Sequence, residues 1–165
     1  MRVLSFVVAG ELYAVDVNLV QAVARKMTIT PVPAAPTEIS GIANVKGRVV
    51  TVINLYRLLG YYEKREDNRG IASVNAIVFK ADTNSENFLA LTIGKPGELI
   101  TIDENEIKTL SSSAKNEECY CISKIAEVEN KLYRIIDIDS IIQNYENNGE
   151  QETEELTNGG NENYG

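Results

Sequence analysis

The sequence predicts a mostly β protein made of two related units, each a small barrel of five short strands with a short helix. Three observations lead to this prediction. Apolar residues alternate with a period of two along most of the chain. Turn residues separate the alternating runs at short intervals. One stretch of the chain also matches a later one. With 44% hydrophobic residues among 165, the chain can close a core without disulfides or metals.

The first half is predicted to form two hairpins joined by a proline-rich connector. Asn18–Ala24 is expected to be a short, helical interruption of the strand pattern, amphipathic with Leu19, Val20 and Val23 on one side. In Ile29–Pro36 the three prolines exclude a regular helix or a central strand, so we expect a rigid extended connector with a helical turn near its end. Strands are expected at Val3–Val8, Leu12–Val17, Ser40–Val45 and Arg48–Ile53.

A tight turn and a capped helix complete the second of these hairpins. Gly47 supplies the positive φ that the turn Lys46-Gly47 needs. Asn54 is expected to cap a short helix at Leu55–Leu59, and Gly60 ends that helix.

The second half repeats this organisation after a polar loop at Tyr61–Gly70. Gly94–Gly97 is expected to be a turn, and Asp137 to cap a helix over Ile138–Tyr145. Residues 146–165 hold six glutamates and no basic residue, so this acidic tail is expected to be disordered. Strands are expected at Ala72–Phe79, Phe88–Ile93, Glu98–Ile102, Tyr120–Val128 and Leu132–Ile136.

The internal match supports two related units. Residues 42–59 align with residues 125–142, so that the turn Lys46-Gly47 falls on Glu129-Asn130 and the cap Asn54 falls on Asp137. Residues 12–17 align more weakly with residues 88–93. We expect one body over residues 1–145, with barrels at about 1–65 and 66–145 and a possible exchange of strands. Chance similarity between two hairpin units is the alternative.

Composition excludes several functional classes. The chain has no histidine, which excludes histidine-based nucleophiles, metal sites and proton transfer. Cys119 and Cys121 lack the further ligands that a structural zinc requires, and Gly94-Lys95-Pro96-Gly97 lacks the spacing of a phosphate loop. The acidic cluster at Asp103, Glu104 and Glu106 lacks the central glycine of a calcium loop. We expect no catalytic site, metal or cofactor.

The charge distribution and the opening residues indicate which kinds of partner are expected. The net charge is −8, with +3 on residues 1–60 and −11 on the remainder. This balance argues against nucleic acid, and it indicates a partner facing the first half or simply a solvated surface. The opening MRVLSFVVAG enters a strand pattern at once, so neither secretion nor membrane insertion is expected. Lys46 and the pair Arg25-Lys26 are exposed charges on stiff backbone, as a preorganised docking surface requires.

Between Val20 and Gly60, and again at Leu132–Ile142, the sequence resembles the CheW family of chemotaxis coupling proteins. The family pattern joins a Val-x-x-Val segment, an ITPVP-x-AP connector, a G-[VI]-x-N-[LV]-[RK]-G hairpin, a Val-[IV]-[ND]-Leu segment and a final Leu-Gly. Over residues 3–145 the matching segments are Val20 and Val23, Ile29–Pro36, Gly41–Arg48, Val52–Leu55, Leu59-Gly60 and Leu132–Ile142.

The resemblance implies two intertwined SH3-like barrels and two protein partners. These are the regulatory domain of the histidine kinase CheA, expected along the barrel edges, and the cytoplasmic hairpin tip of a chemoreceptor, expected between the barrels. It also implies a cytoplasmic protein recruited to membrane-associated receptor arrays. Lys46 stands where the family has an arginine. The candidate partner-binding residues are Val20, Val23, Arg25, Asn44, Lys46, Gly47, Arg48, Ile93 and Leu99, and the structural turns and caps are Gly41, Gly47, Asn54, Gly60 and Asp137.

Two other functions remain open from the sequence. The chain is compatible with an adaptor for a non-chemotactic kinase pathway. It is also compatible with a small-molecule-binding β protein or an unrecognised hydrolase that uses the space between the barrels as a pocket.

Overall fold

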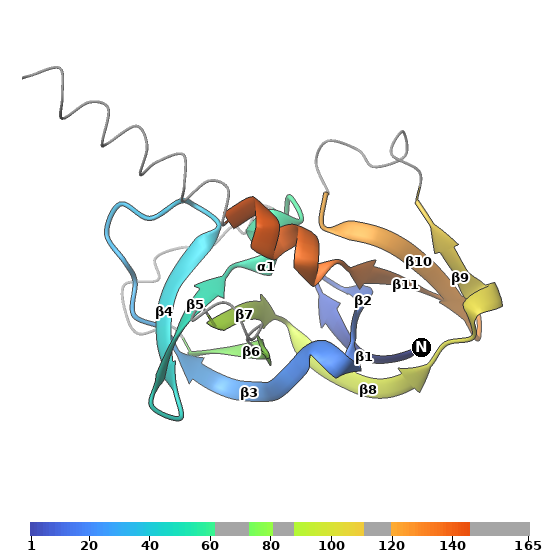
Figure 1. Ribbon diagram of the computed structural model, residues 1–165, viewed down its shortest axis with the longest axis horizontal. Coiled ribbons are helices and arrows are strands. Elements are labelled where there is room, and N and C mark those ends of the chain that lie inside the picture. Colours follow the sequence, from blue (N-terminus) through green and yellow to red (C-terminus); the bar gives the residue numbers. More distant parts are fainter. Residues whose placement is uncertain (62–72, 81–87, 111–119, 146–165) are drawn as a thin grey trace, which may run out of the picture.

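The computed structural model describes residues 1–61, 73–80, 88–110 and 120–145, and Figure 1 shows their arrangement. Most of the loop expected at 61–70, Cys119 and the acidic tail fall outside these residues. The described part contains short 3₁₀ turns at Val17–Leu19 and Glu104–Glu106, helix α1 (Leu55–Leu58) and a helix over residues 138–145. Its strands are β1 (Arg2–Val8), β2 (Glu11–Asp16), β3 (Val20–Thr28), β4 (Ile39–Val45), β5 (Arg48–Ile53), β6 (Ser73–Phe79), β7 (Phe88–Ile93), β8 (Lys95–Thr101), β9 (Ile107–Thr109), β10 (Ile122–Val128) and β11 (Lys131–Ile136).

The strands form two curved sheets with related topology. One sheet has the order β8-β1-β2-β11-β10-β9 and the other the order β3-β6-β7-β5-β4. Each contains a parallel pair, β11 with β2 in the first and β5 with β7 in the second. The hairpin and helix of residues 42–59 therefore occupy the place in one sheet that residues 125–142 occupy in the other. The aligned strands β2 and β7 are equivalent as well.

The two sheets do not divide the chain near residue 65. The first sheet combines β1 and β2 with β8–β11, whereas the second contains β3–β7. The reason is an exchange of strands. The hairpin β1-β2 is followed by β3, which pairs with β6 of the other sheet, and the hairpin β6-β7 is followed by β8, which returns to pair with β1. Each barrel is thus completed by a strand from the other repeat.

Each sheet closes into a barrel through the chain that follows its exchanged strand. After β3, Thr30 forms a two-bond bridge with Ile42 of β4, with nitrogen–oxygen distances of 2.8 and 2.9 Å. After β8, the chain turns at Glu104–Glu106 and pairs with β10 as β9. This short strand gives the first sheet six strands where five were expected. The second sheet has the expected five.

Gly41 lies at this closure and not in a turn. It belongs to β4, at an irregularity in the pairing with β5, and its φ is +146°. A Cβ atom on this residue would lie 2.2 Å from the carbonyl oxygen of Thr30. The absence of a side chain therefore lets the connector approach β4 closely enough to form the bridge.

Three hairpins turn through two residues that both have positive φ. These pairs are Ala9-Gly10, Lys46-Gly47 and Glu129-Asn130, with φ between 51° and 81°. Such turns match the natural twist of the strands that they join. In the second hairpin, the Oδ1 atom of Asn44 also accepts a hydrogen bond from the backbone N–H of Gly47 at 3.0 Å.

The core has three layers. One apolar cluster fills the first barrel around Val3, Ile102 and Ile135, and another fills the second around Val50, Val52 and Val78. The largest cluster lies between the two sheets. It includes Phe6, Tyr13, Ile77, Phe79, Leu91 and Ile141, most of them fully buried.

Both predicted helix caps are present. Asn54 Oδ1 accepts from the backbone N–H of Arg57 at 3.3 Å, and Asp137 Oδ1 accepts from that of Ser140 at 3.2 Å. Gly60, with a φ of 81°, follows the helix α1.

Replacing Asn54 by alanine is expected to lower the free energy of unfolding by about 1 kcal/mol, because the first turn of α1 loses its cap. Urea unfolding of Asn54→Ala measures this loss. Asn54→Asp is the control, since the pseudo-equivalent position carries Asp137, and it is expected to retain most of the stability. Equal losses in the two variants would contradict a capping role.

Two local predictions are wrong. Most of Asn18–Ala24 belongs to β3, because a bulge between Val20 and Ala22 gives a strand the apolar spacing of a helix. Gly94–Gly97 is not a turn, because Lys95–Gly97 is the start of β8 and Gly94 alone separates it from β7. Pro96 is tolerated there because β8 is an edge strand, which needs hydrogen bonds on one side only.

Candidate functional site

The apolar layer between the barrels reaches the surface at two edge strands, β3 and β8. Val20 pairs with Phe79, and Val23 pairs with Ile77. Because paired residues of an antiparallel ladder point to the same side, the bulge between Val20 and Ala22 places both valines on the inter-barrel side. On β8, Leu99 is opposite Leu4, which belongs to the inter-barrel cluster.

We call Val20, Val23 and Leu99 the inter-barrel rim. Val23 is 38% exposed and Leu99 is 55% exposed, whereas Val20 is half-buried against the cluster. Exposed aliphatic side chains at the margin of a buried apolar layer suit an apolar partner. Ile93, expected beside them, is only 4% exposed and belongs to the core. It supports the rim from below and is not a contact residue.

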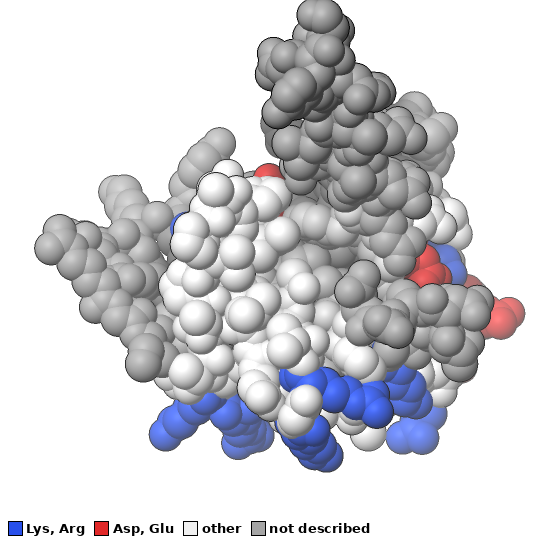
Figure 2. Space-filling model, turned by 60° about the vertical axis from the view of Figure 1, so that its left-hand side comes forward, with Lys and Arg blue, Asp and Glu red and all other residues white. Residues whose placement is uncertain are grey.

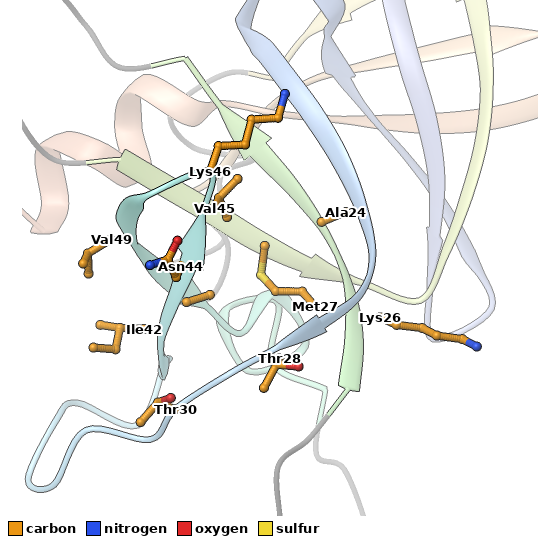
Figure 3. A pocket seen from close by; sticks show the side chains of 11 residues that line it. Ala24, Lys26, Met27, Thr28, Thr30, Ile42, Asn44, Val45, Lys46 and Val49 are labelled. Carbon is orange, nitrogen blue, oxygen red and sulfur yellow. The ribbon is translucent and has the colours of Figure 1, made fainter.

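A second surface lies where β3 and β4, the two edges of one sheet, approach each other. Here an open depression of about 610 Å³ has formed, shown in Figure 3. The strands meet through the bridge between Thr30 and Ile42 and otherwise remain apart. We call this depression the barrel seam. It is lined by Ala24, Lys26, Met27, Thr28, Thr30, Ile42, Ala43, Asn44, Val45, Lys46 and Val49.

The seam combines apolar side chains with positive charge. Two lysines line it, and none of its lining residues is acidic. In the described part of the chain, no carboxylate lies within ion-pair distance of Lys26 or Lys46. Figure 2 shows the side of the molecule that carries β3, β4 and β5, where Lys and Arg side chains follow one edge of a largely uncharged face. This surface therefore suits an acidic partner segment.

Backbone geometry fixes the positions of the seam lysines. Lys46 is the first residue of the turn between β4 and β5, with a φ of 51°. Lys26 also has a positive φ, 56°, at a bulge between Ala24 and Met27, and its backbone N–H donates to Asn75 Oδ1 at 3.4 Å. A positive φ outside glycine is uncommon. It fixes the backbone at both lysines, from which the two side chains point outward in different directions (Figure 3).

The remaining predicted residues surround the seam or the turn. Asn44 and Gly47 build the hairpin tip through the hydrogen bond between them. Arg25 is exposed on β3 beside Lys26 but does not line the depression. The Arg48 guanidinium stacks over the ring of Phe88 at 4.7 Å from the centroid, which holds its charge against β7.

Sequence reasoning missed part of this site. Met27 is buried beneath the seam, and Thr28 and Thr30 line it, but no residue pattern marks the bulge that directs them there. Val49 is 63% exposed at the rim of the seam. A signal for it exists, because two adjacent valines on one strand must face opposite sides and only one enters the core.

The described residues show no constellation for chemistry. Among residues 1–61, 73–80, 88–110 and 120–145, no group of three His, Cys, Asp or Glu side chains could hold a metal ion. Burial raises the pKa of both Tyr120 and Tyr145 above the ordinary tyrosine value, so these hydroxyls stay protonated at neutral pH. Cys121 is buried in the inter-barrel cluster. None of the described helices is long and apolar enough to span a membrane.

Comparison with known proteins agrees with this architecture. The sequence model of the CheW-like domain matches residues 2–146. The chemotaxis protein CheW of Bacillus subtilis is 27% identical over 143 residues, which cover 86% of each chain. That of Thermotoga maritima is 29% identical over 143 residues, covering 86% of this chain and 87% of the relative.

A solved structure extends the comparison to the fold. The crystal structure of the scaffolding protein TtCheW from Thermoanaerobacter tengcongensis superimposes with a TM-score of 0.68 at 26% identity. The match covers 82% of this chain and 87% of that one. The expected mostly β fold with two SH3-like barrels is confirmed.

Proposed function

Because this chain belongs to the CheW-like domain family, we propose that it is a cytoplasmic adaptor of chemotaxis signalling that works by binding alone. It couples the cytoplasmic hairpin tips of chemoreceptors to the histidine kinase CheA, and it reaches the membrane-associated receptor arrays through these partners. The observation that supports the proposal is that a single body carries two exposed surfaces of different character, the apolar inter-barrel rim and the basic barrel seam.

The inter-barrel rim is the surface proposed for the receptor. A receptor tip is a helical hairpin, and an apolar helix face docks through a few aliphatic anchors onto an apolar surface. Val23 and Leu99 are exposed enough to touch such a helix, while Val20 is held in place by the core. Neither β3 nor β8 has a further strand on its outer side in the sheet order, so a helix lying along the rim is not blocked by a ladder neighbour.

The barrel seam and the hairpin tip beside it are the surface proposed for the kinase regulatory domain. Edge strands carry backbone donors and acceptors that a partner strand or loop can use. Lys46 adds a charge at the tip, and Val49 adds an exposed aliphatic side chain. The seam is open and has no carboxylate among its lining residues, which is unlike a catalytic pocket.

Titration calorimetry of the purified chain tests binding of the receptor and binding of the kinase separately. One titrant is a receptor cytoplasmic fragment and the other is the regulatory domain of CheA. Saturable binding of both, and of both together, is expected. Failure to bind either partner would end the proposal.

Replacing Lys46 by glutamate is expected to weaken binding of the kinase regulatory domain about tenfold, which corresponds to about 1.4 kcal/mol. The melting temperature should stay nearly unchanged, because Glu129 has the same φ of 51° in the equivalent hairpin. The measurement is calorimetric titration together with a thermal melt.

Lys131→Glu is the matched control, since Lys131 is an exposed lysine beside the hairpin turn of the other barrel. It is expected to leave kinase binding within about twofold of the parent value. A large fall in melting temperature for Lys46→Glu would show that Lys46 is structural and would remove it from the docking surface.

A further inference from the structure

The described chain ends beside the strand that borders the barrel seam. Tyr145 is the last described residue of the C-terminal helix, and the charge of Glu38 acts on its hydroxyl group. Glu38 immediately precedes β4. In Figure 1 the red end of the helix accordingly lies next to the start of β4. The described chain therefore ends near one end of β4, while the seam lysine Lys46 lies at the other end.

The length of the tail matches this separation. At ~3.3 Å per residue, the seven residues of β4 extend over ~23 Å, and residues 146–155 can extend over ~33 Å. A chain that leaves Tyr145 and follows β4 therefore brings the segment Glu150–Glu155 (EQETEE) to the seam. This segment holds four of the six glutamates of the tail.

Charge and hydrogen-bonding capacity at the seam are complementary to that segment. Lys26 and Lys46 line the seam, and Arg25 lies beside it. On the outer edge of β4, Ile42 already uses its backbone groups in the bridge to Thr30. By the two-residue period of a strand, the backbone N–H and C=O of Asn44 point to the same edge, where no described strand pairs with them.

We propose that the segment Glu150–Glu155 of this chain's own tail binds the barrel seam, along the outer edge of β4 and against Lys26 and Lys46. The tail then acts as a tethered competitor for the seam. A short tether gives it an effective concentration in the millimolar range, so a weak contact is enough for partial occupancy. Exposed ion pairs contribute little individually and are screened by salt. The occupied state is therefore reversible, and a kinase regulatory domain that binds the seam must displace the tail.

Zero-length carbodiimide cross-linking of the full chain, followed by peptide mass spectrometry, tests the proposal without any partner. Amide bonds from the side chains of Lys26 and Lys46 to Glu150–Glu155 are expected at several times the yield found for Lys108 and Lys131. These control lysines are exposed on strands of the other barrel. The excess should disappear in about 1 M salt, where charges are screened beyond ~3 Å.

Two further measurements make the result decisive. Lys46→Glu should lower the cross-link yield at Lys26 severalfold, because the segment loses one of its two anchors. In the full-length variant E150Q/E152Q/E154Q/E155Q, hydrogen exchange at the Asn44 amide should become severalfold faster, with no change in residues 126–129 of the other hairpin. Equal cross-linking of all four lysines, or unchanged exchange at Asn44, would overturn the proposal. So would cross-links that join isotopically labelled to unlabelled chains, because the occupant would then be the tail of a second copy.

Because these measurements use the protein alone, they succeed or fail independently of whether the kinase binds. If the tail occupies the seam and no kinase domain binds, only the proposed function is lost.

Discussion

Gly41→Ala is expected to remove about 3 kcal/mol from the free energy of unfolding and to lower the melting temperature by about 10 °C. The new Cβ atom would lie 2.2 Å from the Thr30 carbonyl oxygen and 2.8 Å from its carbonyl carbon. Backbone atoms cannot move aside as the end of a flexible side chain can. The Thr30–Ile42 bridge therefore has to open, at about 1 kcal/mol for each of its two hydrogen bonds. The φ of +146° adds strain of about 1–3 kcal/mol for any residue other than glycine.

Gly47→Asn is the control for Gly41→Ala. It replaces a glycine of positive φ where no steric clash is expected, and so it measures the general cost of such a replacement. Gly47 also has a positive φ, but nothing lies within 4 Å of a Cβ placed there. Asn130 occupies the corresponding place in the related hairpin with a φ of 64°. The variant is therefore expected to melt within about 2 °C of the parent protein. Thermal unfolding followed by circular dichroism distinguishes the two variants. Similar melting temperatures would refute the role of Gly41 in closing the barrel.

Val23→Glu is expected to weaken binding of a receptor cytoplasmic fragment at least thirtyfold, which corresponds to about 2 kcal/mol. Val23 lies on the inter-barrel side of β3, opposite Ile77. A helix docked there would bury the new carboxylate against aliphatic side chains, and this desolvation is costly. In the free protein the side chain is exposed enough for the carboxylate to reach water, so the stability should change little. Calorimetric titration and a thermal melt measure the two quantities.

Gln21→Glu is the matched control for this variant. It places the same charge on the same strand, two residues away, at an exposed position inside the bulge between Val20 and Ala22. Receptor binding should then remain within about threefold of the parent value. If both variants lose receptor binding equally, long-range charge and not the apolar rim controls the interaction. The receptor surface would then have to be placed elsewhere.

Residue patterns predicted most of the fold because hairpins are local structures. The expected strand Phe88–Ile93 coincides with β7, and Arg48–Ile53 coincides with β5. The caps at Asn54 and Asp137 were predictable because a cap depends on a side chain and on backbone groups three residues away. The match of residues 42–59 with 125–142 located equivalent pieces of both barrels without any knowledge of which strands pair.

Features that depend on distant pairing were not predictable in the same way. The irregular pairing of β3 with β6 is what turns an apparently amphipathic segment into a strand and sets the direction of Val23. The role of Gly41 depends on the approach of Thr30 across the barrel, and a glycine alone does not distinguish a turn from a close contact. Ile93 looks the same in sequence whether its strand is covered on one side or on both. Its burial follows from the first barrel packing against the second, to which β7 belongs.

The exchange of β3 and β8 between the two sheets has a mechanical consequence for a protein that works by contact. The chain crosses from one barrel to the other after β2 and crosses back after β7, so no single flexible linker separates them. The shared layer that contains Phe6 and Phe79 also resists sliding, because close-packed interiors deform little. A force applied to one barrel is therefore expected to move both barrels together as one rigid body, without bending at a hinge between them. A displacement at one bound neighbour would reach the other at nearly its full amplitude.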